Sequence, residues 1–222
     1  MKAAQSISDA SDATWPSDTP AERRKRKVRD SIIEAAETVF AEEGEAGLSM
    51  RRLAERIDYS PAAIYKYFNS KDELLATIRE QFFERLMARL QDTAAIERRD
   101  REGFLACLRA YVQTGIENPN HYRMAFGNFE NAKPQEGTLG YEASSRFTLM
   151  IQDMIERGVL RDVDPELASK SVWASVHGLT SLMTAIPDFP QCPDCDSHHL
   201  TREDMIEFHA EQIVRGLARD DA

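Results

Sequence analysis

The sequence lacks any uninterrupted run of about 18 apolar residues, the length that a helix needs to span a bilayer. The first 22 residues, MKAAQSISDASDATWPSDTPAE, also lack the apolar stretch of a secretory signal. We therefore expect a cytoplasmic protein with no membrane partner. Residues 1–21 are mostly polar, and we expect them to form a disordered N-terminal extension.

Signs of catalysis and of β-structure are missing as well. There is no GxSxG nucleophile elbow, no glycine-rich phosphate loop after a strand and no His-Glu-x-x-His helix. No stretch has the convincing alternation of a strand, whereas apolar residues recur at helical spacing along most of the chain. The sequence predicts an all-α protein that is not an enzyme and that needs no cofactor.

Cysteine is scarce, with three residues in the whole chain. Cys107 lies in an apolar helical pattern, where a buried thiol is expected. Cys192, Cys195, His198 and His199 gather four possible metal ligands within eight residues, so a metal or redox site is an alternative to a plain loop. Structural zinc sites generally draw their ligand pairs from separated parts of a chain, and we assign no metal ligand here.

The segment Ser49–Leu75 carries the clearest positive signal, because it has the pattern of two short helices around a tight turn. Ser49 can cap a helix whose apolar face is formed by Met50, Leu53, Ala54 and Ile57. Asp58 tolerates a left-handed backbone and ends that pattern. Ser60 and Pro61 then start a second helix, predicted over Pro61–Phe68. Such a pair is typical of a helix-turn-helix, in which the second helix enters the major groove of DNA.

A third helix is predicted directly after this pair. Ser70-Lys-Asp-Glu73 has the form of a capping box, which places Lys71 at a helix start, where backbone N–H groups favour a phosphate. On the second helix, Ala62 is small enough to approach base edges, and the tyrosines and lysine that follow can reach phosphates or bases. The predicted DNA-binding residues are Arg24, Arg26, Ser49, Ser60, Ala62, Tyr65, Lys66, Tyr67 and Lys71.

The distribution of charge agrees with this prediction, although the net charge of the chain is -10. Residues 22–71 carry eleven Lys or Arg against nine Asp or Glu, a net +2, so the rest of the chain carries -12. Six of the eleven basic residues lie in the stretch ERRKRKVR, directly before the first predicted helix. A basic arm in that position can reach the minor groove or neighbouring phosphates, and its contribution weakens as salt rises.

At these residues the sequence resembles the tetracycline-repressor (TetR) family. The resemblance is specific over about residues 25–75 and rests on Ser60, Ile64, Tyr65, Tyr67, Phe68, Lys71, Asp72 and Leu74. It implies an N-terminal helix-turn-helix domain, joined by a helix to a larger C-terminal domain for ligand binding and dimerisation. Two positions depart from the family pattern, which usually has glycine in place of Asp58 and often histidine in place of Tyr67. Both departures bear on the contacts to bases and phosphates and not on the fold.

The remainder of the chain is predicted to be helical. The expected helices are Asp30–Glu43, Leu74–Leu90, Glu102–Glu117, Asn120–Phe126, Tyr141–Gly158, one starting at Asp164-Pro165 and one running from Thr201 to about Ala218. Leu74–Leu90 is longer than a DNA-binding domain needs and is expected to connect the DNA-binding domain, residues 22–75, rigidly to the ligand-binding and dimerisation domain, residues 76–222.

A second resemblance concerns the C-terminal half. The motifs Asn118–Phe126 and Trp173–Gly178 resemble a subgroup of the family with a Trp-x-x-x-His-Gly pattern in its ligand domain. Residues four apart share a helix face, so Trp173 and His177 can line one cavity, or they can be ordinary core residues. The predicted ligand-binding residues are His121, Met124, Phe126, Phe147, Trp173 and His177, with Phe104 nearby.

These signals predict a transcriptional regulator, expected to be a repressor, whose homodimer binds a palindromic operator in double-stranded DNA and is released by a small organic effector. Two helix-turn-helix units (reading heads) related by a two-fold axis match the two half-sites of a palindromic DNA sequence. The dimer is expected to form through the helices beginning near Pro165 and near Arg202, both of which carry many apolar residues. A metal- or redox-sensing regulator using the Cys192–His199 loop and a helical interaction protein that binds no DNA are the alternatives.

Overall fold

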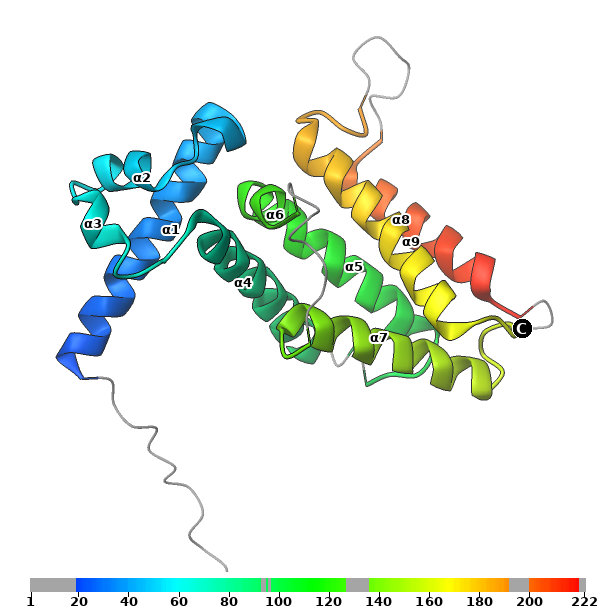
Figure 1. The fold of residues 1–222 in the computed structure, drawn as a ribbon. Helices are drawn as coiled ribbons and strands as arrows, with labels where there is room; N and C mark the ends of the chain where they lie inside the picture. The colour runs from blue at the N-terminus through cyan, green and yellow to red at the C-terminus, as the bar shows by residue number, and fades with distance from the viewer. Residues whose placement is uncertain (1–18, 93–94, 96, 127–135, 192–199, 220–222) are drawn as a thin grey trace, which may run out of the picture.

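The computed structural model describes residues 19–92, 95, 97–126, 136–191 and 200–219. Over these ranges its regular structure is helical, which confirms the predicted all-α fold (Figure 1). The helices are α1 (Pro20–Gly47), α2 (Met50–Arg56), α3 (Pro61–Ile64), α4 (Lys71–Asp92), α5 (Arg101–Glu117), α6 (Pro119–Phe126), α7 (Leu139–Glu156), α8 (Pro165–Ala185) and α9 (Arg202–Leu217). The predicted extension up to residue 18 and the Cys192–His199 loop lie outside the described residues.

Helix α1 begins ten residues before the predicted start at Asp30. Thr19 and Glu22 form a reciprocal cap, in which Thr19 Oγ1 accepts from the Glu22 N–H at 3.2 Å and the Glu22 carboxylate accepts from the Thr19 N–H at 2.7 Å. Pro20 occupies the first helical position. The basic stretch that contains Arg24 and Arg26 is therefore helical, and the prediction of an arm ahead of the first helix is wrong.

The turn between α2 and α3 agrees with its sequence. Asp58 has a positive φ of 56°, the left-handed conformation expected of it. Helix α3, however, ends at Ile64 and not at Phe68. The N–H groups of Lys66 and Tyr67 reach back three residues, to carbonyls 3.2 and 2.8 Å away, so the chain tightens into turns where a longer helix was predicted.

The described residues form two hydrophobic cores, and α4 contributes to both. Its first turns place Leu74 and Ile78 in the core of the N-terminal domain, together with α1, α2 and α3. Its later turns place Phe82 and Leu86 in the core of the C-terminal domain. Met124 of α6 also lies in the N-terminal core, although it is distant in sequence. Both α4 and α6 therefore connect the two domains, whereas the sequence predicted one connecting helix, Leu74–Leu90.

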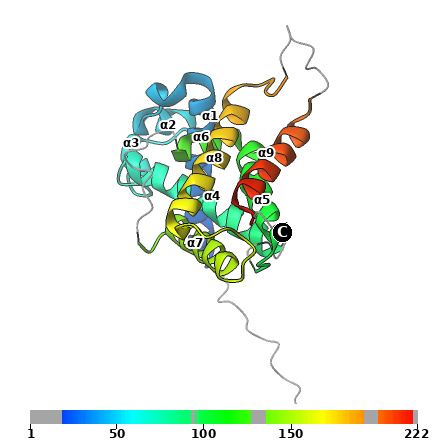
Figure 2. The same cartoon turned by 90° about the vertical axis from the view of Figure 1, so that its right-hand side faces the viewer.

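In the C-terminal domain, α5 is packed against α4, α6, α8 and α9, and α7 covers α4 and α8 (Figures 1 and 2). Gly115 of α5 allows α8 to approach closely, since a Cβ atom there would lie 2.3 Å from Cγ2 of Thr180. Within the described part of the chain, no helix is both long and apolar enough to cross a membrane.

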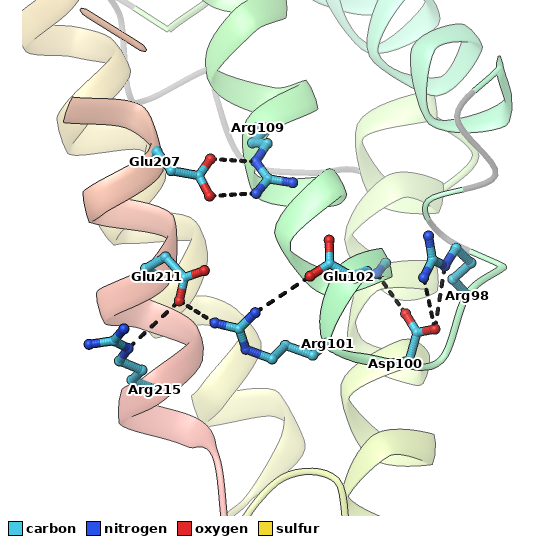
Figure 3. A network of polar contacts seen from close by, with 9 residues as sticks. Arg98, Asp100, Arg101, Glu102, Arg109, Glu207, Glu211 and Arg215 are labelled. Atoms are coloured by element: carbon cyan, nitrogen blue, oxygen red, sulfur yellow. Dashed lines mark hydrogen bonds and ion pairs between the residues drawn. The ribbon is translucent and has the colours of Figure 1, made fainter. Parts of the chain in front are cut away.

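Helix α9 is held on α5 by apolar packing and by a set of ion pairs (Figure 3). Arg109 donates to both carboxylate oxygens of Glu207, at 2.8 and 2.6 Å. Arg101 pairs with Glu211, the second contact between the same two helices. Ion pairs at a surface contribute little stability each, so their main effect here is to fix the register of α9 along α5.

The outer face of α8 and α9 is less apolar than predicted. Figure 2 views these two helices from outside. Many apolar residues of these helices, which were expected to form the dimer interface, are instead buried within the subunit, among them Val172, Val176, Leu179, Ile206 and Val214. Leu167, Leu182 and Phe208 are 69, 45 and 62% exposed, so they carry the apolar surplus of this face. Gly178 and Gly216 lie on the same two helices, and a Cβ atom added to either would meet no atom within 4 Å.

Candidate DNA interface and ligand cavity

The α2–turn–α3 segment lies on the surface of the N-terminal domain and presents most of its predicted contact residues to solvent. Tyr65 is 50% exposed, and Ala62 and Lys66 are exposed beside it. Tyr67 is half-buried and packs against the N-terminal core. Tyr67 therefore combines a structural role with a partly accessible ring, whereas Ile64 and Phe68 are fully buried and hold α3 in place.

The two cap serines are exposed at the starts of α2 and α3. Ser49 Oγ accepts from the Arg52 N–H and Ser60 Oγ accepts from the Ala63 N–H, each at 3.2 Å. A capping hydroxyl uses a lone pair of its oxygen, so its own O–H can still donate to a phosphate oxygen. This geometry suits phosphate contacts by both serines.

The start of α4 differs from the predicted capping box. Ser70 Oγ accepts from the Glu73 N–H at 3.1 Å, as predicted. The Glu73 carboxylate, however, accepts from the backbone N–H of Asn69 at 2.8 Å and from its side-chain amide at 2.7 Å. These bonds lower the pKa of Glu73. Lys71 is half-exposed in the first turn of α4, where the prediction placed it.

The arginines in the basic stretch of α1 differ in their exposure to solvent. Arg24 and Arg26 are exposed, as a role in DNA binding requires. Arg29 faces inward, because its guanidinium group lies 4.5 Å from the ring centroid of Phe68 and donates to Thr77 Oγ1 at 3.0 Å. Arg29 thus ties α1 to residues that follow α3, the reading helix of the helix-turn-helix. The sequence pattern alone did not separate Arg29 from its neighbours.

A cavity of about 630 Å³ lies in the C-terminal domain. Its wall is mostly apolar and comes from α4, α5, α7 and α8, together with the end of α6. Phe126, Phe147 and Trp173 of the predicted ligand-binding residues line it. A cavity of this size and lining matches those that hold small organic molecules. It also reaches Asp72 and Glu73 in the first turn of α4, close to the helix-turn-helix.

His177 lies behind this wall and is not one of the lining residues. Its Nδ1 is 2.5 Å from the hydroxyl of Tyr122 and 3.3 Å from that of Tyr111, which itself lines the cavity. Burial lowers the pKa of His177 and raises that of Tyr122 to about 12. A neutral imidazole therefore accepts from the Tyr122 O–H. The indole N–H of Trp173 donates to Tyr111 Oη at 3.2 Å, so this cluster joins two of the lining residues, Trp173 and Tyr111.

Three other residues are placed differently from the prediction. His121 and Met124 do not line the cavity, because the face of α6 that carries them is turned toward α1 and α4. Phe104 is fully buried against Phe147, at 5.9 Å between ring centroids, and also lies outside the wall. Periodicity indicates that residues are inside but not which of two cores they join.

Arg79 and Cys107 are among the lining residues that were not predicted. Arg79 lines the cavity and donates its Nε–H to the carbonyl of Ala125 in α6 at 3.0 Å, and burial lowers its pKa. Cys107 lines the same cavity, and burial raises the pKa of its thiol to about 12, which makes it an unreactive apolar surface. Cys107 was correctly predicted to be a buried thiol. Both residues lie on helices whose apolar periodicity was recognised.

The described residues contain no group of three or more His, Cys, Asp or Glu side chains placed to hold a metal ion. The candidate ligands Cys192, Cys195, His198 and His199 lie outside those residues, so the structure does not describe their arrangement.

Two short capped helices joined by a tight turn, with the second helix exposed, are carried on a helical domain that has a largely apolar cavity. This arrangement defines a DNA-binding protein of the helix-turn-helix class. Sequence comparison agrees with this class. Residues 32–78 match the model of bacterial regulatory proteins of the tetR family, and residues 104–197 match that of the tetracyclin repressor-like C-terminal domain. The two matches together span more than half of the chain, which belongs to the TetR family of transcriptional regulators.

Individual relatives are distant but extend over most of the chain. The uncharacterised regulator YobS of Bacillus subtilis is 23% identical over 68% of this chain and 76% of its own. The regulator TtgR of Pseudomonas putida is 26% identical over 73% of this chain and 83% of its own. Among solved structures, the TetR-family regulator PfmR of Thermus thermophilus has a TM-score of 0.62 and 25% identity, covering 85% of this chain and 99% of that one.

Proposed function

We propose that this chain is a ligand-responsive repressor in the cytoplasm, with no catalytic activity. Its homodimer binds a palindromic operator, and a small organic effector releases it by occupying the cavity. The observation that carries the proposal is the cavity of about 630 Å³, because its wall includes α4, the helix that starts directly after the reading head. An effector that prefers one position of α4 shifts the equilibrium between two spacings of the heads.

For DNA contact, we propose the exposed row Ala62, Tyr65 and Lys66, with Tyr67 at its edge. Ser49, Ser60 and Lys71 would hold phosphates at helix starts, and Arg24 and Arg26 would extend the contact along α1. The exposure of these residues supports the assignment. Phosphate contacts fix the register of the protein on DNA, and the side chains of the reading helix distinguish bases.

For effector contact, we propose Phe126, Phe147 and Trp173, which line the cavity. His177 would support them from behind through Tyr111 and Tyr122. We keep the Trp-x-x-x-His-Gly subgroup as a proposal that rests on the motif itself. The effector is expected to be predominantly apolar, because most of the wall is apolar.

For dimerisation, we propose the outer face of α8 and α9, with Leu167, Leu182 and Phe208 as its apolar contacts. Gly178 and Gly216 support this choice, because no part of the subunit fills the space over them and a partner helix can approach closely there. Glycine inside a helix costs about 1 kcal/mol relative to alanine, and close packing against a second subunit offsets that cost.

The experiment that tests the effector site uses N-phenyl-1-naphthylamine, a neutral apolar dye that fluoresces in dry cavities. We expect the protein to bind this dye, and Ala143→Phe, which adds a ring to the cavity wall, to weaken the binding by at least tenfold. The matched control is Ala106→Phe on the neighbouring helix α5, which is not a lining residue. Equal dye binding by the wild type and Ala143→Phe would refute the cavity as the effector site.

A further inference from the structure

His121 is buried where α1, α4 and α6 meet, with 1% of its surface exposed. Its Nδ1 lies 2.5 Å from a carboxylate oxygen of Glu37 in α1. Its Nε2 lies 2.7 Å from the carbonyl oxygen of Ile78 in α4. One imidazole ring therefore ties α6 of the C-terminal domain to two helices that build the N-terminal core.

The partners of this ring define its protonation. A backbone carbonyl only accepts hydrogen bonds, so Nε2 carries a proton. A hydrogen bond between Nδ1 and a carboxylate oxygen needs one further proton, which lies between these two atoms. The bond to His121 is also the largest of the interactions that lower the pKa of Glu37, so the carboxylate accepts and Nδ1–H donates.

A third group gives the ring a second possible state. Arg85 of α4 places NH1 3.3 Å from the same Nδ1 and 3.2 Å from the side-chain oxygen of Asn118. A guanidinium group only donates, so it can bond to Nδ1 only when that nitrogen has lost its proton. The neutral ring would then accept from Arg85 while Nε2–H still donates to Ile78.

In both states the two ring nitrogens of His121 have hydrogen-bond partners, but the states differ in which helices the ring connects. In the first state Nδ1–H donates to Glu37 and attaches α1. In the second state the ring is partnered entirely by α4, and Glu37, whose side chain is already 33% exposed, can turn to water. The first state holds one proton more, which leaves for solvent on release and returns from solvent on attachment. A pair of alternatives of this kind is a two-state element that protonation can bias.

We propose that His121 and Glu37 form a proton-dependent latch that positions the N-terminal domain on the C-terminal domain, and that the attached state is the one that binds the operator. Attachment restricts the motion of α1 and the reading head, which lowers the ordering cost of binding DNA. The charged groups in contact with His121 are Glu37 from α1 and Arg85 from α4. Two further titratable groups lie near α6. The guanidinium of Arg123, on α6, lies 5.3 Å from the ring centroid of Phe40 in α1, and His177, on α8, bonds to the hydroxyl of Tyr122 on α6.

The same short helix also reaches the cavity. Phe126, the last residue of α6, lines it, and Arg79, next to Ile78, lines it and bonds to the carbonyl of Ala125. A molecule that displaces Phe126 or Arg79 therefore moves the helix that carries His121. This link to the cavity rests on the proposed effector site, whereas the latch itself does not.

The first test measures the protonation of His121 directly. In the full-length protein with ¹⁵N-labelled histidine, two-bond ¹H–¹⁵N correlation spectra at pH 7.5 distinguish a doubly protonated ring from the Nε2–H tautomer. We expect His121 to be doubly protonated in the wild type and to become the neutral Nε2–H tautomer in Glu37→Gln. The same protonation in both proteins would overturn the latch. This comparison holds even for a variant that no longer binds DNA.

The second test measures affinity for an operator duplex, obtained by selection from random DNA, between pH 6 and 8.5. Wild-type affinity is expected to be level while the free protein holds this proton, as at pH 7.5, and to fall at higher pH, by at most about tenfold per pH unit for each latch, because attachment then takes up one proton. Glu37→Gln and His121→Gln should bind more weakly at pH 6 and with a shallower pH slope. The double variant should bind no more weakly than either single one.

Glu34→Gln is the matched control, since it removes the same charge from an exposed position one turn earlier in α1. It should keep the wild-type slope. An unchanged slope in Glu37→Gln, additive effects of the two substitutions, or tighter operator binding by either variant would refute the latch. None of these outcomes depends on the cavity, so a failure of the dye experiment and a failure of the latch are separate results.

Discussion

Truncation of Met124 should separate the stabilities of the two domains. Met124 belongs to α6 but is buried in the N-terminal core, with 3% of its surface exposed. Met150 of α7 has 0% exposed and belongs to the C-terminal core. Met124→Ala and Met150→Ala are therefore the same chemical change at two nearly fully buried positions in different cores. Each is expected to cost about 2–5 kcal/mol through lost apolar contact and the cavity left behind.

This loss of stability predicts how much faster backbone amides exchange their hydrogens with solvent. Each 1.4 kcal/mol is a factor of ten, so exchange through opening of the affected core should accelerate by about 30-fold to a few thousand-fold. Met124→Ala should show this acceleration in α1 and α2. Met150→Ala should show it in α5 and α7, with much smaller changes in α1 and α2.

Hydrogen–deuterium exchange followed by mass spectrometry at fixed protein concentration, which keeps any association constant, measures the pattern peptide by peptide. The reasoning fails if Met124→Ala leaves exchange in α1 and α2 within threefold of the wild type. It also fails if the two variants affect the same helices. In the first case α6 would contribute nothing to the N-terminal core, and in the second the two cores would open as one unit.

Three further predictions concern DNA, assembly and pH. Lys71→Ala should weaken binding to operator and random DNA alike and reduce the slope of log affinity against log salt by about one; unchanged affinity for both would exclude the phosphate contact. Phe208→Asp should convert a dimer to a monomer in sedimentation at micromolar concentration, whereas Leu149→Asp on α7, which is 59% exposed in the wild type, should not; a monomeric wild type would remove the proposed interface. Burial lowers the pKa of His177, so the unfolded chain binds its proton more readily and stability is lost as the pH falls below about 6.5. A smaller loss of unfolding temperature between pH 7.5 and 5.5 is therefore expected in His177→Gln than in the wild type, and an equal loss would contradict a neutral buried ring.

Local signals in the sequence predicted much of the secondary structure. Asp164 and Thr201 were expected to start helices, and each caps its helix by accepting from a backbone N–H three residues on. Gly158 was expected to end a helix and has a positive φ of 72°. Caps and left-handed turns depend on atoms a few residues apart, so the chain carries all the information they need. The cap at Thr19 and Glu22 was equally local, but the charge run after it was interpreted as an arm.

The family was also readable from the sequence, because the reading head combines several local signals in 27 residues, from Ser49 to Leu75. The cavity was predicted in part, through Phe126, Phe147 and Trp173. Each of these lies on an amphipathic helix, and periodicity alone marks the side that faces the interior.

Only the tertiary structure decided which interior each residue of α6 faces. His121 and Met124 share an eight-residue helix with Phe126, yet they contact the N-terminal domain while Phe126 reaches the cavity. Glu37 and His121 are 84 positions apart, and no local pattern pairs them. The sequence by itself determined where helices start, stop and turn an apolar face inward. The packing of α6 between two cores determined the partners of those faces, because contact energies between distant segments depend on an arrangement that no single helix encodes.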